Sequence, residues 1–516
     1  MGAYVMAHDL GTTGNKATLY DREGTLVGSA YEPYHTWYPH AGWAEQDAEE
    51  WWRAVCTSSH RLLDACDVPG REIACICFSG QMMGCVPLDR DGRALRAAII
   101  WADQRAVEQQ RWLAERVSPA EVYRITGHRL SPSYSLCKLL WLRENDPQVY
   151  HVAHKFTHAK DAIVARLTGS FVTDLSDASG MNLLDLEHGC WSQRILEAAK
   201  IEPSVLPELH RSTDVVGEVR ATVAEEVGVP AGTPVVIGGG DGPCAAAGAG
   251  VVSPGSAYNY IGSSSWIAMA SERPILDPQQ RTFTFAHIVP NMFMPTGTMQ
   301  AAGASYQWAR DQLCPVETLA AQALGVSPYE LMNAEAERSP LGANGLLFLP
   351  YLMGERSPRW NPRARGAFIG LTMRHTRSDL LRAVLEGVTM NLRVILDALR
   401  EQGALVDAMR AIGGGARGRF WMQIMANVYG IPVQRLALLE EATSMGAAIA
   451  GGVGVGLYPG FEAMANVMNR VAEAIRPDPE AQAAYERLFP VFEEAYRALV
   501  PLFERIAEVE NAGGGM

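Results

Sequence analysis

The chain has 516 residues, of which 48% are hydrophobic and 20% are charged, as in a globular protein. A chain of this length exceeds one ordinary hydrophobic core, so we expect two domains. The 44 basic and 57 acidic residues give a formal net charge of −13, which argues against nucleic acid or an anionic membrane as a partner. An anionic ligand would therefore need a local binding device, such as a Gly-rich turn or a metal ion.

The cysteines and the start of the chain indicate a compartment. None of the nine cysteines forms a C-x-x-C pair or lies in a zinc pattern with histidines. Residues 1–10 lack the basic start and apolar stretch of a signal peptide, and no apolar run is long enough to span a bilayer. The sequence predicts a cytoplasmic protein without a membrane partner.

The first segments are predicted to be two strands, at residues 4–7 and 16–20, joined by a turn rich in glycine and threonine. Backbone N–H groups and hydroxyls in such a turn can bind phosphate oxygens. Asp9, before the turn, could hold Mg²⁺, and Lys16, after it, could reach a transferred phosphate. The candidate phosphate ligands are Gly11, Thr12, Thr13 and Lys16. An ordinary hairpin with a solubilising aspartate explains the same residues.

A helix over residues 47–64 and a buried strand over residues 73–78 follow. The next strand, residues 235–237, ends in three glycines and Asp241. Small neighbours would let a substrate approach this carboxylate, which suits a general base. A helix N-cap is the competing interpretation, because Ala245, Ala246 and Ala247 follow.

The second half repeats the alternation of strands and helices. A strand at residues 256–261 ends in Gly262, Ser263 and Ser264, and a helix is predicted over residues 380–399. A strand at residues 408–412 leads into G-x-G-x-x-G at residues 413–418 and a helix over residues 419–429. The dinucleotide-binding motif of NAD enzymes has this form, but here the acidic residue expected at the end of the next strand is missing. We therefore favour a binding site for adenosine at this turn.

These patterns predict an α/β protein with two related halves, residues 1–252 and 253–516. The sequence contains no G-x-x-x-x-G-K-[ST], H-E-x-x-H or G-x-S-x-G, which argues against a P-loop enzyme, a zinc peptidase of that type and an α/β-hydrolase.

Several motifs occur in one order over nearly the whole chain. They are D-L-G-T-T-G at residues 9–14, W-A-E-Q-D at 43–47, S-x-S-x-x-K-L-x-W-L-x-E-N at 133–145, G-E-R-S-P at 354–358, G-x-F-x-G-L at 366–371 and D-L-x-x-A-V-L-E at 379–386. Together they resemble the FGGY carbohydrate kinases, with the xylulokinase branch nearest.

The resemblance implies two ribonuclease H-like domains of the actin/Hsp70/sugar-kinase type around a deep catalytic cleft. The N-terminal domain would bind the sugar and phosphates, and the C-terminal domain would bind ATP. In-line transfer to D-xylulose would use Asp241 as the general base, with Mg²⁺ at Asp9 and Asp241. The other implied site residues are Gly11, Thr12, Thr13, Lys16, Gly262, Ser263 and Ser264 for phosphates; Gln81, Met82, Met83, Trp101 and Asp103, with Asp241, for the sugar; and Gly413, Gly414, Gly415 and Asn427 for the nucleotide. A homodimer is a further expectation.

Two positions depart from the xylulokinase pattern. Met83 stands where that branch has histidine, and Gly242 stands where it commonly has asparagine. A thioether cannot donate a hydrogen bond to a sugar hydroxyl, so polar recognition is lost there. Ribulose, L-xylulose and a glycerol-like polyol therefore stay open as substrates, and so does a catalytically inactive sugar or ATP sensor.

Overall fold

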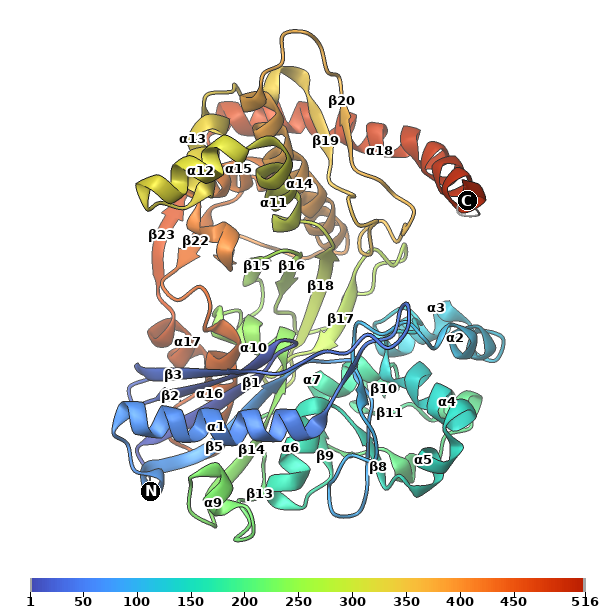
Figure 1. The fold of residues 1–516 in the computed structure, drawn as a ribbon, viewed down its shortest axis with the longest axis vertical. Helices are drawn as coiled ribbons and strands as arrows, with labels where there is room; N and C mark the ends of the chain where they lie inside the picture. Colours follow the sequence, from blue (N-terminus) through green and yellow to red (C-terminus); the bar gives the residue numbers. More distant parts are fainter. Residues whose placement is uncertain (1, 514–516) are drawn as a thin grey trace.

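The computed structural model describes residues 2–513, which form two α/β halves stacked along the long axis (Figure 1). The strands of the first sheet are β1 (Tyr4–Leu10), β2 (Gly14–Tyr20), β3 (Leu26–Pro33), β5 (Ile73–Gly80), β13 (Val215–Glu218) and β14 (Pro234–Gly240). Those of the second are β15 (Ala257–Ile261), β16 (Ser265–Met269), β17 (Phe283–Ala286), β18 (Phe293–Met299), β21 (Met409–Ile412), β22 (Val433–Leu436) and β23 (Val471–Ile475). The first sheet has the order β13-β14-β5-β1-β2-β3, and the second has the order β17-β18-β16-β15-β21-β22-β23.

Both halves use the same strand pairing. In the first, β1 pairs antiparallel with β2 and parallel with β5, which pairs parallel with β14. In the second, β15 pairs antiparallel with β16 and parallel with β21, which pairs parallel with β22. Every residue of β5 is buried, as expected for a strand with parallel neighbours and both faces covered. The predicted two-domain α/β fold is confirmed.

The alternation of side chains along β1 explains how its sheet is covered. Met6 and Leu10 face α1 (Ala48–Cys66) and α6 (Ala159–Thr168), whereas Val5 and Ala7 face α16 (Ala442–Gly454). In the second half, α14 (Arg377–Glu401) and α15 (Arg419–Tyr429) cover one face of the sheet, and α10 (Asp241–Gly248) covers the other.

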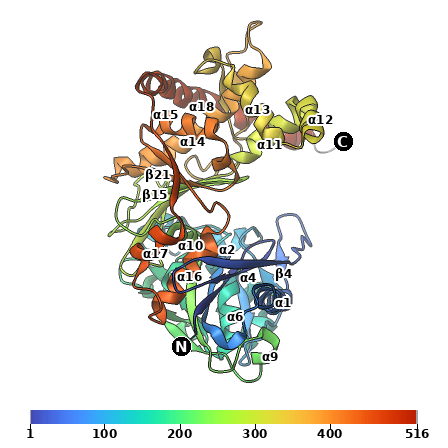
Figure 2. The ribbon, with the colours of Figure 1, turned by 90° about the vertical axis from the view of Figure 1, so that its left-hand side faces the viewer.

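Helices α10 and α16 cross between the halves, because each follows a strand of one sheet and packs on the other sheet. Figure 2 shows both at the junction. A Cβ on Gly248 would lie 1.8 Å from the Ala442 oxygen, and one on Gly446 would lie 1.9 Å from the Cys244 oxygen. Glycine at both positions permits this contact, which places Asp241, the first residue of α10, between the two halves. The boundary at residues 252 and 253 stays a prediction.

Smaller elements surround the sheets. The remaining helices are α2 (Val107–Ala114), α3 (Pro119–Thr126), α4 (Ser135–Asn145), α5 (Pro147–Val152), α7 (Leu175–Ala178), α8 (Gln193–Ala199), α9 (Ala224–Val227), α11 (Gly303–Leu313), α12 (Pro315–Leu324), α13 (Pro328–Glu337), α17 (Phe461–Met468) and α18 (Pro479–Gly513). The short strands are β4 (Glu45–Gln46), β6 (Val86–Leu88), β7 (Ala98–Ile99), β8 (Lys155–Thr157), β9 (Val172–Asp174), β10 (Leu184–Asp185), β11 (Cys190–Trp191), β12 (Glu208–His210), β19 (Leu347–Leu349) and β20 (Ala367–Ile369). Within residues 2–513, no helix has the length and apolar character needed to cross a membrane.

Candidate active site

Two carboxylates, which we call the cleft pair, lie at the carboxyl edge of the first sheet. Asp9 is near the end of β1, and Asp241 follows β14. Burial raises the pKa of Asp9 to about 6, against a hydrogen bond of 3.2 Å from the Ser79 hydroxyl. Burial, and then the charge of Asp9, raise the pKa of Asp241 to about 7. A carboxylate poised near neutral pH is suited to accept a proton.

The end of β14 is shaped by its glycines. The register with β5 shifts between Val236 and Gly239, and Gly238 adopts a φ of +69°. A Cβ on Gly238 would lie 1.8 Å from the Phe78 oxygen. Gly240 is the N-cap of α10, and Asp241 is its first residue, so the structure does not use Asp241 as the N-cap.

The glycine-threonine turn between β1 and β2 is tied to both halves. Trp101 Nε1 donates to Thr12 Oγ1 at 2.9 Å, and the hydroxyl of Tyr31 donates to Thr13 Oγ1 at 3.1 Å. Lys16 Nζ donates to the backbone oxygen of Glu440 at 3.1 Å, so this cation reaches the second half. The N–H of Gly11 donates to the Gly14 oxygen at 3.1 Å.

The residues expected to line the sugar lie beside the cleft pair. A Cβ on Gly240 would lie 2.5 Å from the Met82 sulfur, so Met82 packs against the backbone next to Asp241. Gln81 is buried, and its Nε2 donates to Gln46 Oε1 at 2.7 Å and to the Gly11 oxygen at 3.2 Å. Met83 has a φ of +63°.

Trp101 and Asp103 differ in their surroundings. Trp101 is 39% exposed. Asp103 is buried, accepts the Ala44 N–H at 2.6 Å and pairs with Arg105, whose Nη2 lies 2.7 Å from Asp103 Oδ2. A contact between Asp103 and a sugar stays a prediction, because this carboxylate already has partners inside the protein.

Aromatic residues of the second half lie near Asp241, and no sequence pattern pointed to them. The Tyr258 hydroxyl donates to the Gly242 oxygen at 3.2 Å and accepts from Trp266 Nε1 at 2.7 Å. Trp266 stacks on Tyr260 with ring centroids 4.1 Å apart. These rings come from β15 and β16, so the second half contributes an aromatic group that contacts the start of α10.

The second half contains a pocket of about 470 Å³ between two of the predicted Gly-rich turns. Gly262 and Ser263 line one side, and Gly414 and Gly415 line the other. The other lining residues are Ile261, Gly303, Tyr306, Gln307, Ser327, Tyr329, Glu330, Asn333, Arg417, Gly418 and Trp421. Those from residues 303–333 were missed, because helices α11 and α13 carry no phosphate-binding pattern in their sequence.

Three of the predicted residues are not among those that line this pocket: Ser264, Gly413 and Asn427. Gly413 shapes the turn, since its φ is +85° and a Cβ would lie 2.7 Å from the Ile261 oxygen. Asn427 Oδ1 instead accepts the Asp478 N–H at 2.8 Å. A nucleotide contact from Asn427 stays a prediction without support from this geometry.

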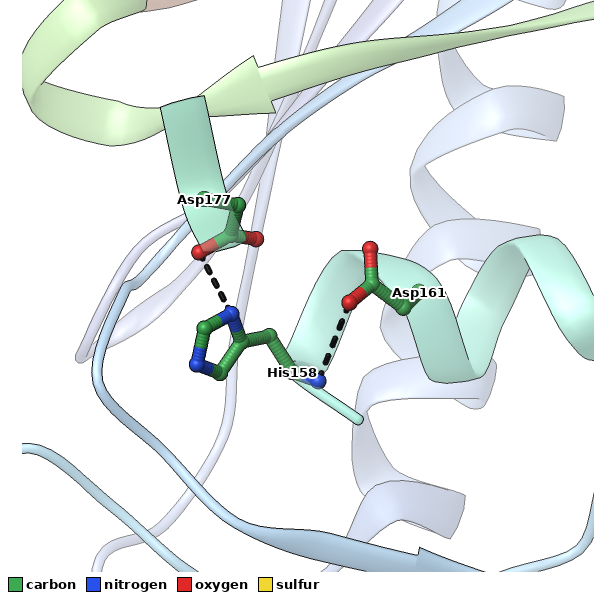
Figure 3. A group of neighbouring side chains, drawn as sticks. All are labelled: His158, Asp161 and Asp177. Atoms are coloured by element: carbon green, nitrogen blue, oxygen red, sulfur yellow. Dashed lines mark hydrogen bonds and ion pairs between the residues drawn. The ribbon is translucent and has the colours of Figure 1, made fainter. Parts of the chain in front are cut away.

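Near Asp241 lies a buried lysine with three carboxylates, which we call the buried ion cluster: Lys160, Asp161, Asp174 and Asp177. Lys160 Nζ lies 2.6 Å, 3.0 Å and 3.2 Å from the respective carboxylates. Figure 3 shows His158 with two members of this cluster, Asp161 and Asp177. The Nδ1 of His158 lies 2.6 Å from Asp177 Oδ1. His158, Asp161 and Asp177 are close enough together to hold a metal ion, but the Lys160 ammonium already supplies the positive charge.

The cluster is connected to the end of β14. Ser176 donates its hydroxyl to Asp174, and the Gly240 N–H donates to Ser176 Oγ at 3.0 Å. The Gly238 N–H donates to the Ser212 oxygen at 3.1 Å. These bonds satisfy N–H groups that the bulge removes from the sheet, and they hold the backbone that carries Asp241.

Comparison with known proteins identifies the family of the chain. The N-terminal domain model of the FGGY family of carbohydrate kinases matches residues 4–248, and the C-terminal domain model matches residues 257–455. The chain is 33% identical over 497 residues to a xylulose kinase of Staphylococcus epidermidis, covering 95% of this chain and 96% of that protein. Crystal structures titled gluconate kinase and xylulose kinase, both from Lactobacillus acidophilus, match at 28% identity with a TM-score of 0.90, each covering 98% of this chain and 99% of the other.

The two family models cover most of the chain, and the relatives align along nearly their whole length. The chain belongs to the FGGY family of carbohydrate kinases, and it is an ATP-dependent carbohydrate kinase.

Proposed function

We propose that this kinase transfers the γ-phosphate of ATP to D-xylulose and forms D-xylulose 5-phosphate, with Asp241 as the general base. The observation that carries the proposal is the position of Asp241, which lies at the junction of the halves with a pKa raised to about 7. The matching Staphylococcus protein, named a xylulose kinase, supports the choice of sugar.

Electrostatics favour a neutral sugar over gluconate, the second candidate suggested by one matching structure. The charges that act most strongly on Asp241 are those of Asp9 and Asp177, and both raise its pKa. A sugar acid would bring another negative charge to this edge, and like charges at short range are unfavourable. A ketose carries no such charge.

In the proposed reaction, Asp241 accepts the proton of the attacking hydroxyl, and domain closure excludes water from the cleft. Lys16 and the turn of Gly11, Thr12 and Thr13 would neutralise and orient the phosphates. Asp9 suits Mg²⁺, because it offers a buried carboxylate whose charge also raises the pKa of Asp241, and a cation there would offset that charge. Mg²⁺ supplies charge neutralisation at the transferred phosphate when bound.

We place adenosine in the pocket of the second half, with its phosphates extending from Gly262 and Ser263 toward the cleft. The Tyr329 and Trp421 rings offer apolar walls, and Asn333 offers donors and acceptors. Residues 1–252 and 253–516 remain our proposed domains, although α16 lies on the first sheet. A cytoplasmic location and a homodimer remain expectations.

The experiment that tests the proposal is sugar-dependent ADP release with Mg-ATP across D-xylulose, D-ribulose, L-xylulose, gluconate and glycerol, with Asp241→Asn as the control. We expect the highest kcat/KM on D-xylulose, with loss of turnover in the variant. Preference for gluconate would contradict the electrostatic argument and keep the kinase. ATP binding without stimulation by any sugar would indicate the inactive sensor.

A further inference from the structure

Lys138 is a buried lysine of α4 whose ammonium has three backbone acceptors. Its Nζ donates to the oxygens of Met83 at 2.7 Å, Ile100 at 2.8 Å and Ser133 at 2.5 Å. The side chain is fully buried, and no ion pair involving it occurs among the described residues. An ammonium has three N–H groups, so all of its donors are used.

The three acceptors belong to separate segments that meet beside the cleft. Met83 follows Met82, which packs against Gly240 next to the base. Ile100 precedes Trp101, whose indole donates to Thr12 in the phosphate-binding turn. Ser133 lies in the loop before α4. Lys138 therefore joins the segments carrying Met83 and Trp101 from behind, on the side away from the cleft.

Burying this lysine is unfavourable unless its bonds compensate. Burial lowers the pKa of Lys138 to about 7, and the charge of Asp103 raises it only in part. Stability alone would be served as well by an apolar side chain if the three carbonyls found other partners. The cation is thus expected to have a function in the geometry of the segments that it joins.

We propose that Lys138 is a positioning residue for the sugar: its three hydrogen bonds set the distance between the Met83 and Trp101 segments and so the width of the subsite in front of Asp241. This inference rests on the proposed function, because it assumes that these two segments line the sugar. Lys138 itself contacts neither substrate. Its loss should act on sugar kinetics and leave the separate nucleotide pocket unchanged.

The test is Lys138→Met, which keeps an unbranched side chain one atom shorter and removes the donors. Because a subsite of altered width would hold the sugar less well in both the ground state and the transition state, we expect kcat/KM for D-xylulose to fall about 100-fold, mainly through KM. The KM for ATP should stay within about twofold of the wild type. Lys138→Gln, which can still donate to one or two carbonyls, should be intermediate, and it serves as the readable variant if Lys138→Met does not fold.

A matched control is Lys155→Met. Lys155 Nζ also donates to backbone oxygens, at 2.7 Å from Ser204 and 2.8 Å from Leu206, away from the cleft. It should lower the melting temperature without changing either KM. If the Lys138 variants lose stability or kcat but keep the wild-type KM for sugar, the lysine is only structural and the inference is wrong. If the proposed function is wrong, the wild type itself will not use D-xylulose, and this result differs from a failure of the inference about Lys138.

Discussion

The cleft pair and the buried ion cluster both contain buried carboxylates, but only those of the cluster are paired with a buried cation. In the cluster, the Lys160 ammonium lies within 3.2 Å of three carboxylates. Burial alone would lower the pKa of Lys160, but the three carboxylates raise it well above its usual value. Among the described residues, neither Asp9 nor Asp241 forms an ion pair; the charge of Lys16 lowers the pKa of Asp9, but burial outweighs it and raises the pKa values of both carboxyls. Carboxylates that support the structure are neutralised by the protein itself, whereas those at the cleft are left to a proton or an external cation.

The largest effect should come from removing the base of the cleft pair. Asp241→Asn is expected to lower kcat by about 10²–10⁴-fold, because the amide cannot accept the proton. Sugar-dependent ADP release measures this loss, and equilibrium binding should still detect sugar and ATP. The folded-state pKa of Asp241 is raised, so its ionisation destabilises the fold as pH rises through about 7. The variant should therefore melt at a higher temperature than the wild type at pH 8, and a lower one would contradict this account.

A substitution in the buried ion cluster should lower the stability of the protein. Lys160→Met leaves three buried carboxylates without their cation, and we expect the free energy of unfolding to fall by about 3–5 kcal/mol. Urea denaturation measures the change, with Lys155→Met as the control for loss of a lysine that donates to carbonyls. Adding Asp177→Asn to Lys160→Met should recover part of the loss, since one uncompensated charge is removed. No difference between the two lysine variants would show that the cluster is not an ion-pair unit.

The coupling within the cleft pair can be read from pH dependence. Because Asp241 must be ionised to act, kcat/KM for the sugar should rise with pH through a pKa near 7. The charge of Asp9 raises that pKa, so in Asp9→Asn the acid limb of the remaining activity should move to lower pH. An unchanged or higher apparent pKa in this variant would contradict the electrostatic coupling.

The nucleotide pocket should respond independently of both carboxylate groups. Tyr329→Ala removes an aromatic wall and is expected to raise KM for ATP about tenfold, with KM for the sugar unchanged. Asn427→Ala is the comparison, because Asn427 bonds to Asp478 and is not among the lining residues. A larger effect from Asn427→Ala would restore the sequence-based assignment of this residue.

The smallest effect is expected at Met83. Met83→His introduces a hydrogen-bond donor worth about 1 kcal/mol, so KM for D-xylulose should fall about fivefold. Histidine also tolerates a positive φ better than methionine, and Met83 has a φ of +63°. Steady-state kinetics with D-ribulose as the comparison would show whether the gain is specific to D-xylulose. A higher KM for D-xylulose would indicate that the thioether itself contacts the sugar.

Several features were predictable because they rest on short-range patterns. The strands at residues 4–7 and 235–237 and the helix at residues 419–429 follow from apolar spacing, and all three are present. Asp9 and Asp241 were found as candidates because a carboxylate beside glycines at the end of a buried strand is a local signal. The effect of Asp9 on the pKa of Asp241 was not predictable, because residues 9 and 241 are far apart in the chain and meet only at the edge of the sheet.

By itself, the sequence determined the family and the two-half α/β architecture, and it singled out Asp9 and Asp241 as candidates, since ordered motifs and hydrophobic periodicity are properties of the chain. Only the tertiary structure decided which carboxylates form ion pairs inside the protein and which do not. In the folded chain, Asp103 forms an ion pair with Arg105, and three carboxylates surround Lys160. Helices α11 and α13 lie against the Gly-rich turns. The physical reason is that a pKa, an ion pair and a pocket depend on burial and on distances between residues remote in sequence.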